Sequence, residues 1–110
     1  MTGYGGMIEE LMRFFGISLS ELARVFSVSE RALQEVQSGR NERPFFAPDI
    51  CQLGRVRQML VCRFETDEAV RVWLESPRHM FGWSTPKAVL LSRGLGDFIF
   101  YLEREAAVHA

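Results

Sequence analysis

Cysteine and histidine are the residue types in this chain that could act as nucleophiles or hold a metal ion. The sequence contains two cysteines, Cys51 and Cys62, and two histidines, His79 and His109. The cysteines fall in one expected helix, where a rise of about 1.5 Å per residue separates them by roughly 16 Å, too far for a disulfide. No metal-ligand spacing is present. We therefore expect both cysteines to be reduced core residues.

The polar residues form no recognisable catalytic group. Neither histidine accompanies a cysteine or serine in a known nucleophile motif, and there is no P-loop or dinucleotide-binding glycine motif. The stretch RGLGD at 93–97 has too few glycines to cradle a phosphate. His79 and His109 are more typical of exposed polar residues than of catalytic bases. The sequence predicts no enzymatic activity, no cofactor and no metal site.

Charge and hydropathy argue against a membrane or a general affinity for nucleic acid. The chain has 13 Lys and Arg against 14 Asp and Glu, so no net charge attracts it to a polyanion. It lacks the run of roughly 18 apolar residues that spans a bilayer, and its start, MTGYGGMIEE, lacks the pattern of a secretion signal. We expect a cytoplasmic protein with one compact core.

Apolar residues recur at a helical period along the whole chain, and no alternation at period two is long enough for a strand. The sequence therefore predicts an all-α fold. The expected helices span residues 7–15, 19–26, 30–38, 50–64, 66–76, 87–93 and 97–106.

Two of these helices, joined by a tight turn at 27–29, have the helix-turn-helix arrangement. Ala23 is small where the helices would cross, and Ser27 stands where a glycine is usual because the turn is left-handed. The second helix would face the major groove, where Arg reads guanine and Gln reads adenine. The candidate DNA-binding residues are Ser29, Arg31, Gln34, Arg40 and Arg43.

The charge of this N-terminal region limits its affinity for DNA. Residues 1–48 carry five Arg against six Glu, and Glu30 and Glu35 would lie close to phosphates. Affinity grows with the number of phosphates neutralised, so useful binding requires a dimer or a larger complex. The alternative is that the two helices only pack against each other.

The sequence also predicts which residues are buried in the loop at 39–49 and in the expected helices at 50–64 and 97–106. Phe45 and Phe46 should fix the loop at 39–49 to the core, and Asp49 should cap the helix that follows. That helix is apolar almost all round, so we expect it to pack on two sides, with Arg57 either paired or reaching the edge. FIFYL at 98–102 covers most of the last helix, so part of it is a candidate partner surface; the alternative is deep burial.

The loop between two prolines, residues 77–86, combines aromatic residues and Met with flanking charges. This composition is typical of the centre and rim of protein interfaces. The alternative is a loop that folds over its own core. We assign Trp83 to partner contact and Phe81 to the core. The large apolar residues are Met80, Phe81 and Trp83, and the rim charges are Arg78 and Lys87.

The order of residues from Ala69 to the end resembles the toxin-binding domain of the Xre/MbcA/ParS antitoxin family. The matching features are WLESP at 73–77, then Gly82, then TP at 85–86, then Gly94 and a final amphipathic helix. An upstream helix-turn-helix is also that family's arrangement. The resemblance implies a helix-turn-helix region at 1–48 packed on a toxin-binding region at 49–110.

The resemblance also implies a function and partners. An antitoxin of this family is not an enzyme; it covers the active-site entrance of a toxin of the RES or ParT type, which consumes NAD or transfers ADP-ribose. It often represses its own operon, and we expect a homodimer on operator DNA. The tail at 107–110 would reach toward the toxin. The candidate toxin-binding residues are Met80, Trp83, Lys87, Arg104, Val108, His109 and Ala110.

Three positions depart from the family's pattern. Trp83 stands where a second glycine is common, Gly94 follows a shorter connection, and Ala107 replaces a glycine in the tail. The loop and tail could therefore fit a different partner. The alternatives are a helix-turn-helix transcription regulator without a toxin, whose C-terminal helices serve dimerisation, and an orphan adaptor that binds another protein.

Overall fold

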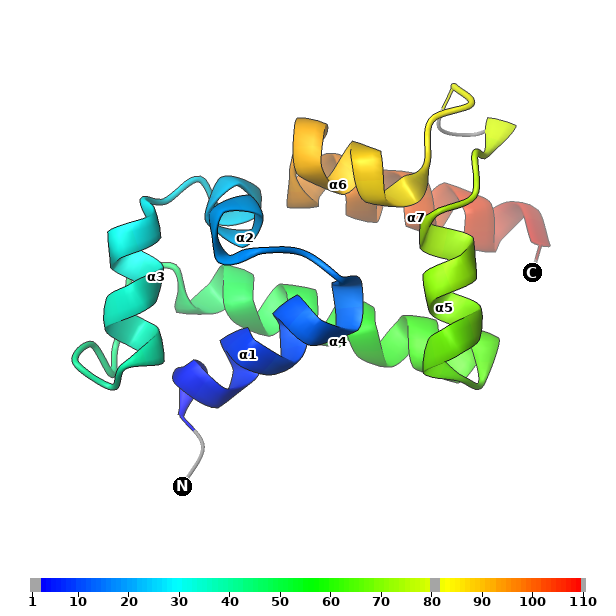
Figure 1. The fold of residues 1–110 in the computed structure, drawn as a ribbon. Helices are drawn as coiled ribbons and strands as arrows, with labels where there is room; N and C mark the ends of the chain where they lie inside the picture. The colour runs from blue at the N-terminus through cyan, green and yellow to red at the C-terminus, as the bar shows by residue number, and fades with distance from the viewer. Residues whose placement is uncertain (1–2, 80–81, 110) are drawn as a thin grey trace.

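The computed structural model describes residues 3–79 and 82–109, with side chains up to residue 104. Within this part the chain forms seven α-helices and no strand, which confirms the all-α prediction (Figure 1). The helices are α1 (Tyr4–Phe15), α2 (Leu19–Phe26), α3 (Glu30–Gln37), α4 (Ala47–Phe64), α5 (Asp67–Leu74), α6 (Pro86–Arg93) and α7 (Leu95–His109).

The helices from both predicted regions share one core. α1 packs against α3, α4 and α5, while α2 packs against both α3 and α6. α6 and α7 lie together on one side of the molecule (Figure 1). All seven helices contribute to one continuous cluster of buried side chains. The largest fully buried residues are Ile8, Leu11, Leu22, Leu33, Ile50, Leu53, Leu60, Leu74, Leu90, Phe98 and Leu102.

Side-chain caps fix the first residue of several helices. Ser18 and Glu21 form a reciprocal capping box at the start of α2, with the Ser18 hydroxyl accepting from the Glu21 N–H at 3.1 Å. Ser29, Thr66 and Thr85 each accept a hydrogen bond from the N–H three residues later, at the starts of α3, α5 and α6. These caps satisfy N–H groups that a helix cannot pair internally, so they mark the expected starts closely.

The start of α4 differs from the prediction. The helix begins at Ala47, with Phe46 in the capping position, so Asp49 lies within the first turn and does not cap it. Phe46 is buried and its ring lies 6.0 Å from that of Phe26, whereas Phe45 is 82% exposed. Only one of the two phenylalanines therefore fixes the loop to the core, and its burial sets where α4 begins.

The rest of α4 buries one face instead of two. Its buried residues, Ile50, Leu53, Val56 and Leu60, recur every three or four positions along one stripe. Cys62 and Met59 lie on the other side and are exposed, and Cys51 is half-buried. The predictions of packing on two sides and of core cysteines are therefore wrong. Apolar residues around a helix do not reveal which of them neighbouring helices cover.

Arg57, the charged residue inside the apolar stripe of α4, is both paired and located at the edge of the core. Its side chain is one-third exposed, and Nη1 lies 3.2 Å from Oε2 of Glu10 on α1. The guanidinium carbon also lies 5.3 Å from the centre of the Phe14 ring. The side chain thus reaches the edge of the core and meets both a carboxylate and a ring face there, so its charge is partly hydrated and partly paired.

The turn between α2 and α3 adopts the left-handed conformation that glycine usually supplies. Ser27 has φ 57° and ψ 44°, and its N–H donates to the carbonyl of Arg24 at 3.1 Å. The N–H of Val28 donates to the Ala23 carbonyl at 2.9 Å. Ala23 and Leu33 are buried where the two helices meet. A serine therefore accommodates the same tight turn, at some conformational cost.

Candidate functional site

The loop between α5 and α6 is closed on itself by backbone hydrogen bonds. The Arg78 N–H donates to the Ser84 carbonyl at 3.1 Å, and the Trp83 N–H donates back to the Arg78 carbonyl at 2.9 Å. A third bond joins the Gly82 N–H to the His79 carbonyl at 3.0 Å. The two ends of the loop are therefore held together. Met80 and Phe81, including the core assignment of Phe81, lie outside the described residues.

Trp83 projects from this loop into solvent. It has φ 66°, directly after Gly82 at φ 64°, and 67% of it is exposed. Its ring meets the His79 ring edge to face, with the centroids 5.3 Å apart. A bulky residue in the left-handed region costs of the order of 1 kcal/mol or more. The structure thus holds a large indole in water in an unfavourable backbone conformation.

Lys87 takes a different position from the interface rim that the sequence predicted. Its Nζ donates to the Gly16 carbonyl at the end of α1, at 2.8 Å, and lies 3.9 Å from Oε1 of Glu75. Its side chain is only 23% exposed. The carbonyl end of a helix attracts a cation, and this attraction turns Lys87 inward. No sequence pattern could show this contact, because Gly16 and Lys87 are 71 residues apart.

Phe100 is the exposed large apolar residue among the α7 side chains that the structure describes, and the helix extends further than predicted. Phe98 and Leu102 are buried, whereas Phe100 is 53% exposed. The Arg104 guanidinium lies 5.6 Å from the centre of the Phe100 ring. The helix continues through 109, so most of the expected tail belongs to α7. The side chains of Val108 and His109 and the whole of Ala110 lie outside the described part of the chain.

The candidate DNA-binding residues gather around α3. Arg31 and Gln34 are exposed, and Arg31 lies 3.9 Å from Glu35 one turn further along. The Ser29 hydroxyl caps the helix by accepting from the Ala32 N–H. The two remaining arginines, Arg40 and Arg43, are exposed in the connection that follows the other end of α3. Arginines thus flank both ends of an acidic helix.

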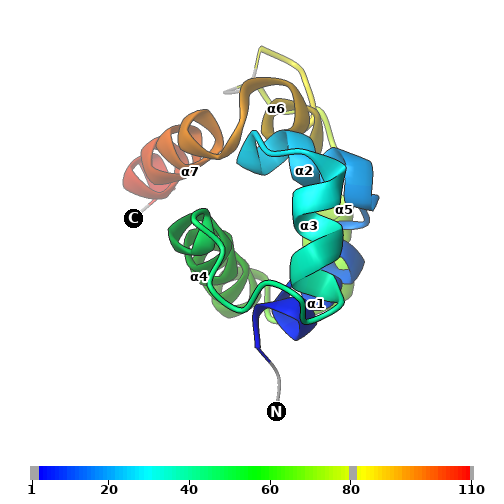
Figure 2. The ribbon, with the colours of Figure 1, turned by 90° about the vertical axis from the view of Figure 1, so that its left-hand side faces the viewer.

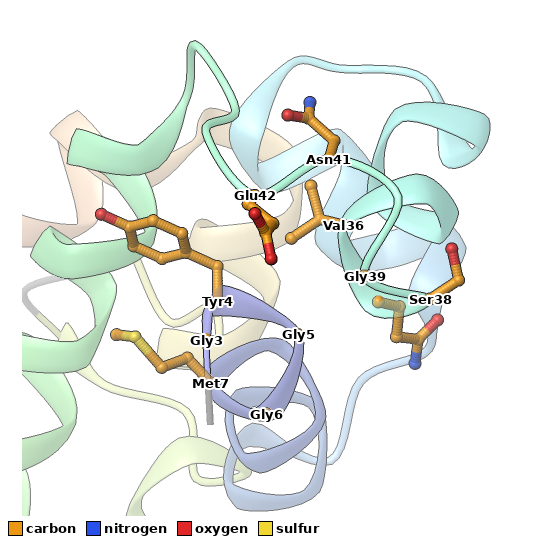
Figure 3. A pocket seen from close by; sticks show the side chains of 11 residues that line it. Gly3, Tyr4, Gly5, Gly6, Met7, Val36, Ser38, Gly39, Asn41 and Glu42 are labelled. Atoms are coloured by element: carbon orange, nitrogen blue, oxygen red, sulfur yellow. The ribbon is translucent and has the colours of Figure 1, made fainter. Parts of the chain in front are cut away.

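A cleft between α1 and the end of α3 was not expected from the sequence. It has a volume of about 630 Å³, and Asn41 and Glu42 stand opposite the start of α1 (Figure 3). α1 begins there without a side-chain cap. A Cβ on Gly5 would lie 3.0 Å from the Val36 carbonyl oxygen, so a glycine is needed for this approach. The repeated glycines at 3–6 were the available signal.

Two negative findings concern the described residues alone. No group of three or more His, Cys, Asp or Glu residues among them could hold a metal ion. None of the helices formed by residues 4–109 has the length and apolar character that a membrane crossing requires.

No known protein family, curated protein or solved structure matches this chain. The resemblance to antitoxins therefore rests on the quoted residues alone. The exposed surfaces of the chain are the remaining indication of function, and the best defined are the Trp83 loop, the outer side of α7, and α3.

Proposed function

We propose that this protein is an antitoxin that binds a cognate toxin of the RES or ParT type and covers the entrance to its active site. The observation that carries the proposal is Trp83, two-thirds exposed on a loop closed by backbone hydrogen bonds. The toxin class comes from the order of motifs between Ala69 and the C-terminus. The Trp83 loop lies within this stretch of motifs.

The geometry of the loop suits binding to another protein. Tryptophan is enriched among the residues that carry most of an interface's binding energy, because it fills an apolar pocket with few rotatable bonds. A loop already closed by hydrogen bonds loses little further conformational freedom on binding. Trp83 is therefore the expected anchor of the toxin contact. Lys87 instead supports the α6 end of the loop through its bond to Gly16.

The test uses co-expression with the product of the neighbouring reading frame, followed by purification and an assay of NAD loss. The intact chain should co-purify with that protein and suppress NAD loss. Trp83→Ala should weaken binding by about 2 kcal/mol or more, since a truncated anchor leaves an empty pocket. Val72→Ala is the matched control, because Val72 is 65% exposed on α5, outside the loop.

Two results would contradict this proposal. The first is unchanged affinity of the Trp83→Ala variant with its helical circular dichroism intact, which would remove Trp83 as the anchor. The second is a chain that neither binds the neighbouring gene product nor alters NAD loss.

A second function is supported by α3. We infer that a homodimer binds operator DNA through this helix, because Arg31 and Gln34 are exposed on it and the Ser27 turn holds it against α2. Binding by the purified chain should weaken steeply with salt, and Arg31→Ala should reduce it. Glu9→Ala, on the exposed side of α1, is the control. Salt-independent or undetectable binding would reject this function.

The alternatives remain distinguishable by the same experiments. A regulator without a toxin would bind a palindromic DNA site and leave the neighbouring gene product active. An orphan adaptor would form one stable complex with another protein and show no DNA affinity. Toxin neutralisation and operator binding would both place the protein in the cytoplasm.

A further inference from the structure

The outer side of α7 carries a short strip of three residues: Asp97, Phe100 and Arg104. Spacings of three and four residues place them on one side of the helix. All three are exposed, while Phe98 and Leu102 anchor the other side in the core. The anchored side fixes the rotation of α7, so Phe100 cannot turn inward. The strip therefore keeps a phenyl ring in water between an acid and a base.

Among the described residues, the surface beside the start of the strip is open. A Cβ built on Gly96, next to Asp97, would meet no atom within 4 Å. The Phe100 ring has the Arg104 guanidinium 5.6 Å from its centre, toward the far end of the strip, and the ring of its neighbour Tyr101 edge to face at 5.6 Å between centroids. The absence of a side chain at Gly96 leaves room for a second helix to approach the backbone closely.

The order of the charges makes the strip complementary to itself in one orientation. If two α7 helices pack antiparallel about a two-fold axis near Phe100, Asp97 of each copy lies opposite Arg104 of the other. The two phenyl rings then meet at the axis. A parallel pair would instead place each charge against its own kind. A contact with two-fold symmetry needs this kind of self-complementary patch.

We infer that a second copy of this chain covers the strip, through an antiparallel contact between the two α7 helices. One helix per copy buries less than the roughly 1,200 Å² of a standard interface, so the dimer should be weak, with a dissociation constant on the order of 10 µM. The inference does not depend on a toxin. It supplies the surface for a homodimer and assigns Arg104 to self-contact, leaving the Trp83 loop free.

The test is sedimentation velocity of the full chain, without toxin or DNA, from about 1 to about 300 µM. The intact chain should shift from monomer to dimer across this range. Asp97→Arg and Arg104→Asp should each weaken dimerisation about tenfold or more, because each places like charges together. The doubly exchanged D97R/R104D chain should recover to within about threefold, because the pairs form again with reversed polarity.

Phe100→Glu should also abolish the dimer, and Val72→Glu on α5 is its matched control, since Val72 is a comparably exposed apolar residue. Circular dichroism confirms that each variant is folded. A monomer at every concentration of the intact chain would overturn the inference, whatever the variants do. A double exchange as weak as the single ones would overturn the antiparallel pairing. Neither result bears on toxin binding, which the NAD assay measures separately.

Discussion

At the residue scale, one ammonium group joins the end of α1 to the start of α6. Lys87 Nζ donates to the Gly16 carbonyl at 2.8 Å and has the Glu75 carboxylate beside it at 3.9 Å. Gly16 ends α1 in the left-handed conformation, which leaves its carbonyl available. Removing the ammonium would leave the Gly16 carbonyl without this donor and the Glu75 carboxylate without this cation.

Lys87→Met removes the ammonium charge and keeps most of the aliphatic part of the side chain. We expect the free energy of unfolding to fall by about 1 to 2 kcal/mol, since a hydrogen bond from a charged donor is worth more than a neutral one. Urea denaturation measures the change. Arg55→Met, which removes an exposed cation in the middle of α4, is the control and should change stability by less. An equal loss of stability in both variants would mean that removing one positive charge, and not the contact with Gly16, causes the effect.

Substitutions of Trp83 show whether its backbone conformation lowers the stability of the protein. At φ 66° a glycine is unstrained, whereas a β-branched residue is strongly disfavoured. We therefore expect Trp83→Gly to be more stable than Trp83→Val by about 1 kcal/mol or more, as measured by thermal or urea unfolding. Both variants should lose toxin affinity. Equal stabilities would show that the loop relaxes away from its left-handed conformation, so that Trp83 is not held in a strained state.

At the element scale, the close approach of α1 to α3 distinguishes two helical glycines. A Cβ on Gly5 would lie 3.0 Å from the Val36 carbonyl oxygen and 3.1 Å from that of Gln37, both backbone atoms. A Cβ on Gly54, inside α4, would meet the end of the Met7 side chain at 3.6 Å, an ordinary contact. The same substitution should therefore have opposite effects at these two positions.

Gly54→Ala should raise the free energy of unfolding by about 0.5 to 1 kcal/mol, because alanine favours a helix more than glycine does. Gly5→Ala should lower it by about 1 kcal/mol or more, since α1 must move away from α3 to admit the methyl group. Each variant is the other's control in urea denaturation. Stabilisation by both would show that α1 does not need to approach α3 this closely.

The ends of the helices show what the sequence could predict. Ser18, Ser29 and Thr85 cap through contacts within three residues, so local pattern was enough to place those starts. The start of α4 depends on Phe46 reaching Phe26, a contact between distant segments. Local pattern pointed to Asp49 there, and burial of an aromatic ring outweighed it.

In the candidate site, too, local sequence predicted some features, and others depend on tertiary packing. The composition of the loop indicated an exposed aromatic residue, and Trp83 is exposed. The inward turn of Lys87 and the exposure of Cys62 depend on which helices lie next to which. A periodic pattern identifies an apolar stripe, but only tertiary packing decides which part of it is covered. The all-α prediction was more robust because period is a property of each segment alone.

At the scale of the whole molecule, the two candidate binding surfaces lie far apart. The protein is elongated, with extents of 42 × 25 × 20 Å. α3 lies at one end and the loop between α5 and α6 lies toward the other (Figure 1). Viewed from the α3 end, α3 stands in front and the loop lies behind α6 (Figure 2). A toxin on the loop would therefore leave α3 open to DNA.

This separation predicts that toxin and DNA bind together and independently. The affinity for labelled operator DNA, measured by fluorescence anisotropy, should change by less than about threefold when saturating toxin is added. A larger increase is expected only if the toxin links two copies of the chain, so that they bind the DNA bivalently. Trp83→Ala should affect toxin binding alone, and Arg31→Ala should affect DNA binding alone. Mutual exclusion of the two ligands would require a toxin that reaches across the long axis to α3. In that case Trp83 would be one edge of a much larger interface, and repression would be lost whenever toxin is bound.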